Sequence, residues 1–135
     1  MVYFCGNKLI LPSKRRRLYT LFLFDLKQCT IAEIYSDKSF NILACKTSGI
    51  SNQHRQGGQS SQRFERERNN NINIWFKKLN NLITNISGNI KVGSHDFYRK
   101  KFEEKLSYEN KNKIKLFFIS EYCNESGVWQ HINHL

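Results

Sequence analysis

The sequence predicts an α/β protein: a single layered domain in which helices flank a mixed β-sheet. Two observations predict this class. Near the N-terminus, three short runs of aliphatic, aromatic and alternating residues are joined by only two or three polar residues, which is typical of antiparallel strands. Further along the chain, segments with helical spacing alternate with two short apolar runs, which is the order of βαβ crossovers.

The first three strands are short and apolar, and they are predicted at 18–26, 29–35 and 39–46. The third carries Phe40, Ile42 and Ala44 on one face, as the two-residue period of a strand requires. The stretch 47–60 that follows is polar and contains three glycines, with a lone isoleucine as its apolar side chain. We therefore expect an exposed loop there, and a loop of this length in a small domain is often functional.

The hydrophobic period changes after this loop. Apolar residues from Phe64 to Ile86 recur at helical spacing, which predicts a long amphipathic helix over 61–86 with Ser60 or Ser61 as its N-cap. The elements after it alternate in type, and they are predicted as a strand at 90–95, a helix capped by Asp96, a strand covered on both faces at 113–122 and a helix at 125–135.

Length and charge restrict the function. The chain has 135 residues, with 22 Lys+Arg against 11 Asp+Glu and a formal net charge of +11. This length accommodates one core, and the charge indicates a polyanionic partner, most often nucleic acid. No apolar run reaches the roughly 18 to 20 residues that span a bilayer, and the N-terminus lacks a signal pattern. We therefore expect a cytoplasmic protein without a membrane partner.

Neither a metal nor a cofactor is expected. The four cysteines lie far apart without a Cys-x-x-Cys pair, and they are predicted to be buried free thiols: Cys5, Cys29, Cys45 and Cys123. His131 and His134 are three residues apart, but a zinc site needs further ligands that the sequence does not supply nearby. The carboxylates do not form the cluster that a metal-dependent nuclease requires.

The stretch from His54 to Arg68 carries residues suited to chemistry. Gly57 and Gly58 permit positive φ and a close approach to another molecule. Gln59 follows just before the predicted helix, where unpaired backbone N–H groups can hold an anion or a developing oxyanion. Nearby arginines can make bidentate contacts with the phosphates of structured RNA, and they are Arg55, Arg63, Arg66 and Arg68. A glycine-rich turn followed by a solvated arginine face is the alternative explanation of the same residues.

The combination of these residues resembles a known signature. Gly57-Gly58-Gln59-Ser60 followed by Arg63-Phe64-x-Arg66-x-Arg68 is similar to the middle domain of eukaryotic and archaeal class 1 peptide chain release factors. The resemblance continues in the same order over nearly the whole chain, at 3–8, at 92–97 and at Glu121-Tyr122 with Gly127. It implies a ribonuclease H-like domain at 18–135 with its Gly-Gly-Gln loop at 47–60. The residues before it, 1–17, are predicted from their own composition to be an N-terminal basic segment.

The resemblance also implies an activity. It implies that the chain promotes hydrolysis of the peptidyl-tRNA ester in the ribosomal peptidyl transferase centre, during termination or the rescue of stalled ribosomes. Gly57 and Gly58 would permit the backbone shape. The backbone amide of Gln59 would stabilise the transition state, and its side chain would admit and position water. Arg63, Arg66 and Arg68 would contact large-subunit ribosomal RNA, and Arg55, which adds charge beside the tip, is a further candidate for such a contact. Gln59 becomes a candidate for N-methylation, and no cofactor is implied.

Departures from the family pattern leave alternatives open. Gln56 stands directly before the glycines, where basic residues are usual, and the basic run at 14–17 has no counterpart. That run is expected to be a solvated arm, with a nuclear-localisation signal or an RNA contact as alternatives. Counterparts of the codon-reading domain and of the domain that recruits a GTPase are not found in this sequence. The chain is therefore expected to be a fragment, to depend on separate partners, or to release stalled chains without reading a codon. A non-catalytic ribosome-binding module and a factor that cleaves the tRNA are further alternatives.

Overall fold

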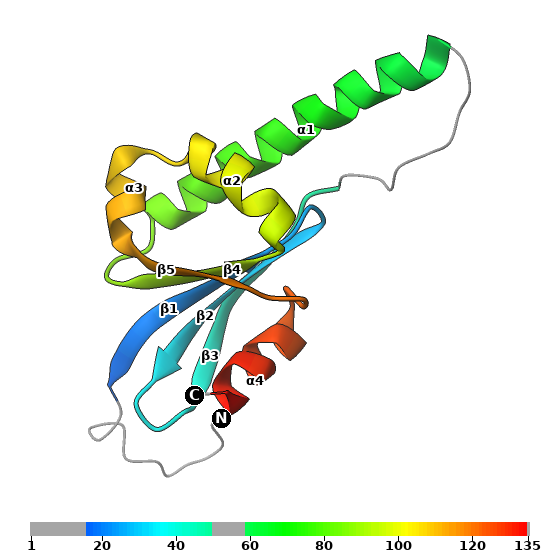
Figure 1. Ribbon diagram of the computed structural model, residues 1–135. Helices are drawn as coiled ribbons and strands as arrows, with labels where there is room; N and C mark the ends of the chain where they lie inside the picture. Colours follow the sequence, from blue (N-terminus) through cyan, green and yellow to red (C-terminus); the bar gives the residue numbers. More distant parts are fainter. Residues whose placement is uncertain (1–15, 50–58, 135) are drawn as a thin grey trace.

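The computed structural model describes residues 16–49 and 59–134. Within these residues the chain forms five strands and four helices, drawn in Figure 1. In chain order they are β1 (Arg17–Phe24), β2 (Gln28–Tyr35), β3 (Phe40–Thr47), α1 (Gln59–Thr84), β4 (Ile90–Ser94), α2 (Asp96–Lys105), α3 (Tyr108–Lys113), β5 (Ile114–Ile119) and α4 (Glu125–Asn133). None of the helices in this part of the chain is long and apolar enough to cross a bilayer.

The strands form one mixed sheet in the order β3-β2-β1-β4-β5. β1 pairs antiparallel with β2, which pairs antiparallel with β3, whereas β4 runs parallel to both β1 and β5. The three helices α1, α2 and α3 lie on one face of the sheet and α4 lies on the other (Figure 1). The predicted α/β class, an antiparallel meander followed by βαβ units, is therefore confirmed.

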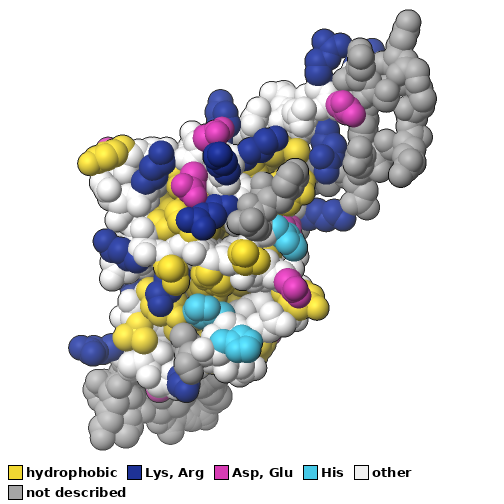
Figure 2. Space-filling view, viewed as in Figure 1, with side chains coloured by type: hydrophobic (Ala, Val, Ile, Leu, Met, Phe, Trp, Pro, Cys, Tyr) yellow, Lys and Arg dark blue, Asp and Glu magenta, His cyan; other side chains and the backbone are white. Residues whose placement is uncertain are grey.

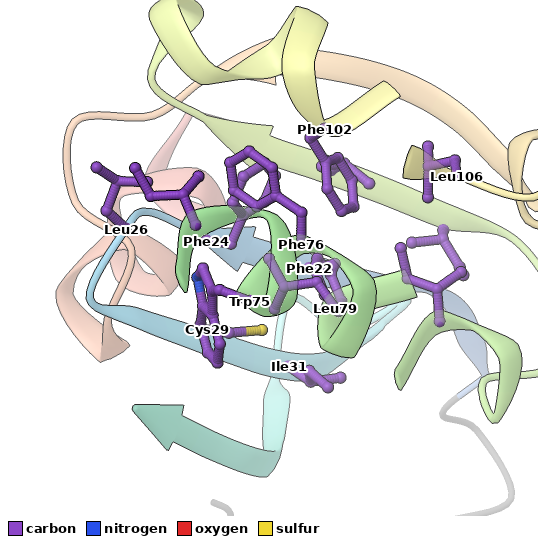
Figure 3. Packing of buried hydrophobic residues seen from close by; sticks show 14 residues of the cluster. Phe22, Phe24, Leu26, Cys29, Ile31, Trp75, Phe76, Leu79, Phe102 and Leu106 are labelled. Carbon is purple, nitrogen blue, oxygen red and sulfur yellow. The ribbon is translucent and has the colours of Figure 1, made fainter. Parts of the chain in front are cut away.

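Aromatic rings fill the larger core, between the sheet and the helices α1 and α2 (Figure 3). Phe24 of β1 and Phe102 of α2 lie with their ring centroids 4.4 Å apart, and Phe76 of α1 meets both rings edge to face at 5.8 to 5.9 Å. These three side chains are fully buried. Because aromatic side chains bury large apolar areas, this cluster fixes α1 on the sheet.

A smaller core lies beneath α4. Val128 and Ile132 of α4 pack against Leu21, Leu23 and other residues on that face of the sheet. A side chain at Gly127 would overlap the carbonyl oxygen of Tyr122, so α4 approaches the chain before it as closely as a glycine allows.

The second half of α1 belongs to the core. Among the α1 side chains that the structure describes, the buried ones all follow position 71, and they are Ile72, Trp75, Phe76, Leu79 and Ile83. At 1.5 Å per residue, the 26-residue helix is about 39 Å long, and Gln59 lies about 20 Å before Ile72. The first half of α1 consequently projects beyond the body of the domain (Figure 1).

Two predicted helix caps were wrong. α1 begins at Gln59, so Ser60 and Ser61 lie inside the helix instead of capping it. The N-cap of α2 is His95 and Asp96 is the first helical residue, because β4 ends at Ser94 and leaves a single residue for the turn. The loop predicted at 47–60 is shorter at both ends, since Thr47 belongs to β3, and residues 50–58 lie outside the described part of the chain.

The last strand also differs from its prediction. We expected a strand at 113–122 that is covered on both faces, but β5 is shorter and lies at the edge of the sheet. Leu116 and Ile119 are exposed on it. A continuous apolar run is typical of a buried strand, so the prediction was wrong here. The position of a strand at the edge of a sheet depends on strand order, which local sequence does not encode. The strands that are covered on both faces are the central ones: β1 is buried from Tyr19 to Phe24, and β4 has no exposed residue.

The short helix α3 was not predicted, and one buried-thiol prediction was wrong. Cys29 and Cys123 are buried free thiols as expected, whereas Cys45 is exposed because β3 is the other edge strand. Cys5 lies outside the described residues.

Candidate functional site

Gln59 occupies the first position of the projecting helix α1. The N–H groups of the first turn have no intrahelical acceptor, and the helix dipole adds partial positive charge at this end. The first turn contains no acidic residue that would compete for an anion there. The other residues predicted at the tip, Gly57, Gly58 and Arg55, lie outside the described part of the chain. Their roles, like that of the Gln59 side chain, stay predictions.

Arginine side chains line the projecting part of α1. Arg63 is 83% exposed and forms a weak ion pair with Glu67, with 3.6 Å between Nε and the carboxylate. A surface pair of this kind contributes little stability, so Arg63 can exchange it for a phosphate. Arg66 is also exposed, one turn further along the same face. Figure 2 shows Lys and Arg side chains gathered on this projecting part, with fewer acidic ones among them.

Arg68 differs from the other two arginines of α1. It lies four residues before the buried Ile72, and so on the core-facing side of the helix. The side chain is half-buried, and its Nε atom is buried without a hydrogen-bond partner among the described residues. The structure therefore brings Arg63 and Arg66 together and sets Arg68 apart.

The point at which α1 leaves the core is tied to the turn between β1 and β2. The indole Nε1 of Trp75 donates a hydrogen bond of 2.8 Å to the carbonyl oxygen of Asp25. The Asp25 carboxylate in turn accepts from the backbone N–H groups of Lys27 and Gln28, at 2.7 and 2.8 Å. This Asx-type turn holds the acceptor of the Trp75 bond in place.

The C-terminal end of α1 is held by α3. Lys113 Nζ donates to the carbonyl oxygens of Ile83, Thr84 and Ile86 at 3.3, 3.0 and 2.8 Å. The last carbonyls of a helix lack intrahelical donors and carry partial negative charge, so a cation stabilises them. α1 has no basic residue in its own last turn, and Lys113 supplies the cation from another helix.

A buried amide completes this junction. Asn110 of α3 is 1% exposed and donates to the side-chain and carbonyl oxygens of Asn80, at 2.7 and 2.8 Å, and to the Thr84 hydroxyl at 2.9 Å. Sequence reasoning missed this helix and its contacts. The available signal was Ser107, whose hydroxyl caps α3 by accepting from the Asn110 N–H group.

The basic run predicted at 14–17 divides into two parts. Arg17 lies in β1, pairs with Glu33 at 3.3 Å and donates to the Ser87 carbonyl oxygen at 3.2 Å. It therefore ties β1 to β2 and to the turn before β4, and it is not part of a solvated arm. Arg16 is exposed, and its backbone is bonded to Ser36. Residues 14 and 15 lie outside the described part of the chain.

His131 has a structural environment. Its Nε2 atom lies 2.6 Å from the Tyr19 hydroxyl, and its ring stacks on Phe118 with centroids 5.2 Å apart. Burial lowers the pKa of His131, and the nearby Lys91 and His134 lower it further. Within residues 16–49 and 59–134, no group of three or more His, Cys, Asp or Glu side chains is placed to hold a metal ion.

Comparison with known proteins identifies relatives of the chain. No protein-family model matches it. The chain is 30% identical over 145 aligned positions to peptide chain release factor subunit 1 of Archaeoglobus fulgidus, an alignment that covers 95% of this chain and 35% of that protein. The corresponding protein of Picrophilus torridus is 33% identical over 125 positions, which cover 85% of this chain and 30% of the relative. The chain thus spans about a third of these relatives' length.

Solved structures share the fold. The crystal structure of an archaeal translation termination factor superposes with a TM-score of 0.63 at 14% identity, over 83% of this chain and 32% of that one. The Thermoplasma acidophilum Pelota protein superposes with a TM-score of 0.58 at 16% identity, over 85% and 31%. The fold is therefore that of one part of these proteins. By sequence, the chain is a homologue of archaeal peptide chain release factor subunit 1 over that part, which confirms the predicted resemblance.

Proposed function

We propose that the chain acts in translation as a release-factor-like protein and promotes hydrolysis of the peptidyl-tRNA ester on the ribosome. The observation that carries this proposal is the position of Gln59. It begins a helix whose first half, about 20 Å long, projects from the domain with exposed arginines. An arm of this shape suits insertion into a narrow, RNA-lined space. Homology to release factors also supports a release-factor-like function.

In the proposed reaction, a water oxygen attacks the carbonyl carbon of the ester. The tetrahedral intermediate carries negative charge on the former carbonyl oxygen, and the Gln59 N–H group donates to that oxygen. The Gln59 side chain positions the water. The bond to the tRNA 3′ oxygen then breaks, that oxygen takes up a proton, and the peptide leaves as a carboxylic acid. The ribosome supplies the rest of the site, and no cofactor takes part.

The arginines have a separate role in this proposal. Arg63 and Arg66 contact phosphates of large-subunit ribosomal RNA, and so do Arg55 and Arg68. Because the chain spans only about a third of its relatives, codon reading and recruitment of a GTPase are assigned to other proteins or to other parts of a longer one. Gln59 is the proposed site of N-methylation. Action on ribosomes corresponds to a cytoplasmic location.

The test is release of labelled peptide from ribosomes loaded with peptidyl-tRNA. We expect the wild-type chain to release peptide, and Gln59→Ala and Gly58→Ala to lower the rate at least about tenfold, because both disturb the positioning of water or backbone. Asn70→Ala is the matched control, since Asn70 is exposed on the same helix. Equal rates for wild type and both tip variants would refute the proposal.

A proline variant isolates the backbone amide. Gln59 is the first residue of α1, where proline is tolerated because its missing N–H group has no helical acceptor. Gln59→Pro therefore removes the proposed oxyanion donor and keeps the helix. We expect a further loss beyond Gln59→Ala, about 100-fold if the N–H group stabilises the intermediate. Identical rates for the two variants would exclude a role for the amide.

The same assay separates the alternatives. A non-catalytic ribosome-binding module, which the net charge of +11 favours, would bind ribosomes in a salt-dependent manner and release nothing. Cleavage of the tRNA itself would leave a shortened tRNA end, whereas ester hydrolysis leaves the tRNA intact. Electrophoresis of the tRNA after the reaction distinguishes these outcomes.

A further inference from the structure

We infer that Trp75 and Lys113 are positioning residues for the proposed release reaction: they fix the axis of α1 and thereby the place of Gln59. This inference rests on the proposed function and adds to it the residues that position the tip of the arm. Neither side chain is near Gln59 in the sequence, and both act from the body of the domain.

The first reason is that the described part of the arm has no anchor of its own. Of the side chains described between positions 59 and 71, none is buried and only Arg68 is half-buried. Of the described side chains of α1, the buried ones that hold its direction therefore lie where the helix meets the body, from Ile72 onward. Apolar contacts there hold the helix against the sheet, but they are non-directional and leave sliding and rotation less restricted. Hydrogen bonds are directional, so they restrict the sliding and rotation of α1 that the apolar contacts allow.

Trp75 and Lys113 provide such bonds at two separate points along the axis. The Trp75 indole is bonded to the Asp25 carbonyl oxygen at 2.8 Å, next to the place where the arm begins. Figure 3 shows this indole within the core cluster. Lys113 Nζ binds three carbonyl oxygens at the other end, the shortest being that of Ile86 at 2.8 Å. Two separated points define the direction of a rod, which one point does not.

The geometry is that of a lever. Trp75 lies 16 residues after Gln59 and 8 residues before Ile83, the first of the residues that Lys113 binds. At 1.5 Å per residue these spans are about 24 Å and about 12 Å. If α1 pivots at Trp75, a shift of about 0.5 Å at the Lys113 end moves Gln59 by about 1 Å. A misplacement of about 1 Å in a reacting group can cost about 100-fold in rate.

Kinetics distinguish positioning from stability. The test variants are Lys113→Met, which keeps length without charge, and Trp75→Phe, which keeps a ring without the N–H donor. Lys113→Arg is the conservative variant, and Val128→Ala in the core beneath α4 is a control that lowers stability away from α1. We expect Lys113→Met and Trp75→Phe to lower the rate at saturating chain about tenfold, with less than a twofold change in half-saturating concentration. Lys113→Arg should recover most of the rate, and Val128→Ala should retain it at temperatures where it stays folded.

A distance measurement tests the inference without any activity. Cys45 is exposed whereas Cys29 and Cys123 are buried, so a spin label reacts at Cys45 in a Cys5→Ser background. A second label at Glu65→Cys, exposed on the arm, reports the direction of α1. We expect one narrow distance distribution in this parent and a broader or shifted one after Lys113→Met or Trp75→Phe, but not after Val128→Ala.

The two measurements also separate failure of this inference from failure of the proposed function. An unchanged distance distribution in both variants would overturn the inference, whatever the release rates. A changed distribution with an unchanged rate would show that arm direction does not limit release, and would also overturn it. If the wild-type chain releases nothing, the proposed function fails, and a role in positioning Gln59 for release fails with it, whereas the distances still decide whether these residues hold the arm.

Discussion

The hydroxyl of Tyr19 and the Nε2 atom of His131 lie 2.6 Å apart, and this hydrogen bond joins the central strand β1 to the helix α4. The Lys91 ammonium lies over the ring of the same tyrosine, 4.1 Å from its centroid. A protonated His131 would thus carry its charge in a half-buried site next to a cation. For this reason burial, followed by Lys91 and His134, lowers the pKa of His131.

The lowered pKa predicts a pH-dependent stability. The unfolded chain binds a proton at His131 near the ordinary pKa of 6.5, whereas the folded chain binds it only at lower pH. The free energy of unfolding therefore falls as the pH drops below about 6.5 towards the folded-state pKa, and this contribution is constant above that range. Urea unfolding between about pH 5 and pH 7.5 measures the slope of the free energy of unfolding against pH. His131→Phe should reduce this slope. An unchanged slope in that variant would contradict the assignment.

The buried junction between α1 and α3 predicts a local sensitivity to substitution. Asn110→Ala removes the hydrogen bonds that the side-chain amide donates to Asn80 and to the Thr84 hydroxyl, and it truncates a side chain that is 1% exposed. We expect a loss of about 1 to 3 kcal/mol in the free energy of unfolding. Asn112→Ala, at an exposed position of the same helix, should change it by less than about 0.5 kcal/mol. Equal losses in the free energy of unfolding for Asn110→Ala and Asn112→Ala would contradict a stabilising role of the Asn110 hydrogen bonds.

Close packing at the start of α4 predicts that Gly127 is required. A Cβ atom there would overlap the Tyr122 carbonyl oxygen, which belongs to the backbone and cannot rotate away. Gly127→Ala is therefore expected to lose at least about 1 to 3 kcal/mol despite the better helix propensity of alanine. The neighbouring exposed Ser126 offers the control Ser126→Ala. Thermal unfolding of both variants gives the comparison, and a stabilised Gly127→Ala protein would disprove the overlap.

The thiols should differ in reactivity. Burial, with a contribution from Asp25, raises the pKa of Cys123 to about 12, and burial also raises that of Cys29. Thiolates are the reactive form, so both should resist iodoacetamide in the folded protein, whereas the exposed Cys45 should react. Mass spectrometry of the peptides after native labelling measures this order. Modification of Cys123 as fast as Cys45 would show that the site is open.

Much of the fold was accessible from the sequence because local periodicity decides it. The alternation in β2 and the helical spacing from Ile72 to Ile83 are properties of neighbouring residues, and both elements were predicted within a few positions. Burial of β5 was mispredicted because its place at the sheet edge depends on long-range order. The helix α3 has six residues, too few for a period to emerge.

The candidate site likewise has features that the sequence predicts and features that only the structure shows. The motif from Gly57 to Arg68 is recognisable because its residue types and spacing are contiguous in the sequence, and the family that it resembles is the one to which the relatives in the comparisons belong. The bonds of Trp75 to Asp25 and of Lys113 to Ile86 span 50 and 27 residues. A single sequence carries no signal for such pairs, so only the structure reveals how the arm is held.

The most direct test of the central claim is the rate of peptide release from peptidyl-tRNA-loaded ribosomes by wild type, Gln59→Ala and Gln59→Pro at saturating chain. We expect release by wild type, a rate at least about tenfold lower for Gln59→Ala, and a further loss of about 100-fold for Gln59→Pro. Release at the same rate by all three proteins, or no release by wild type that binds the ribosomes, would contradict the central claim.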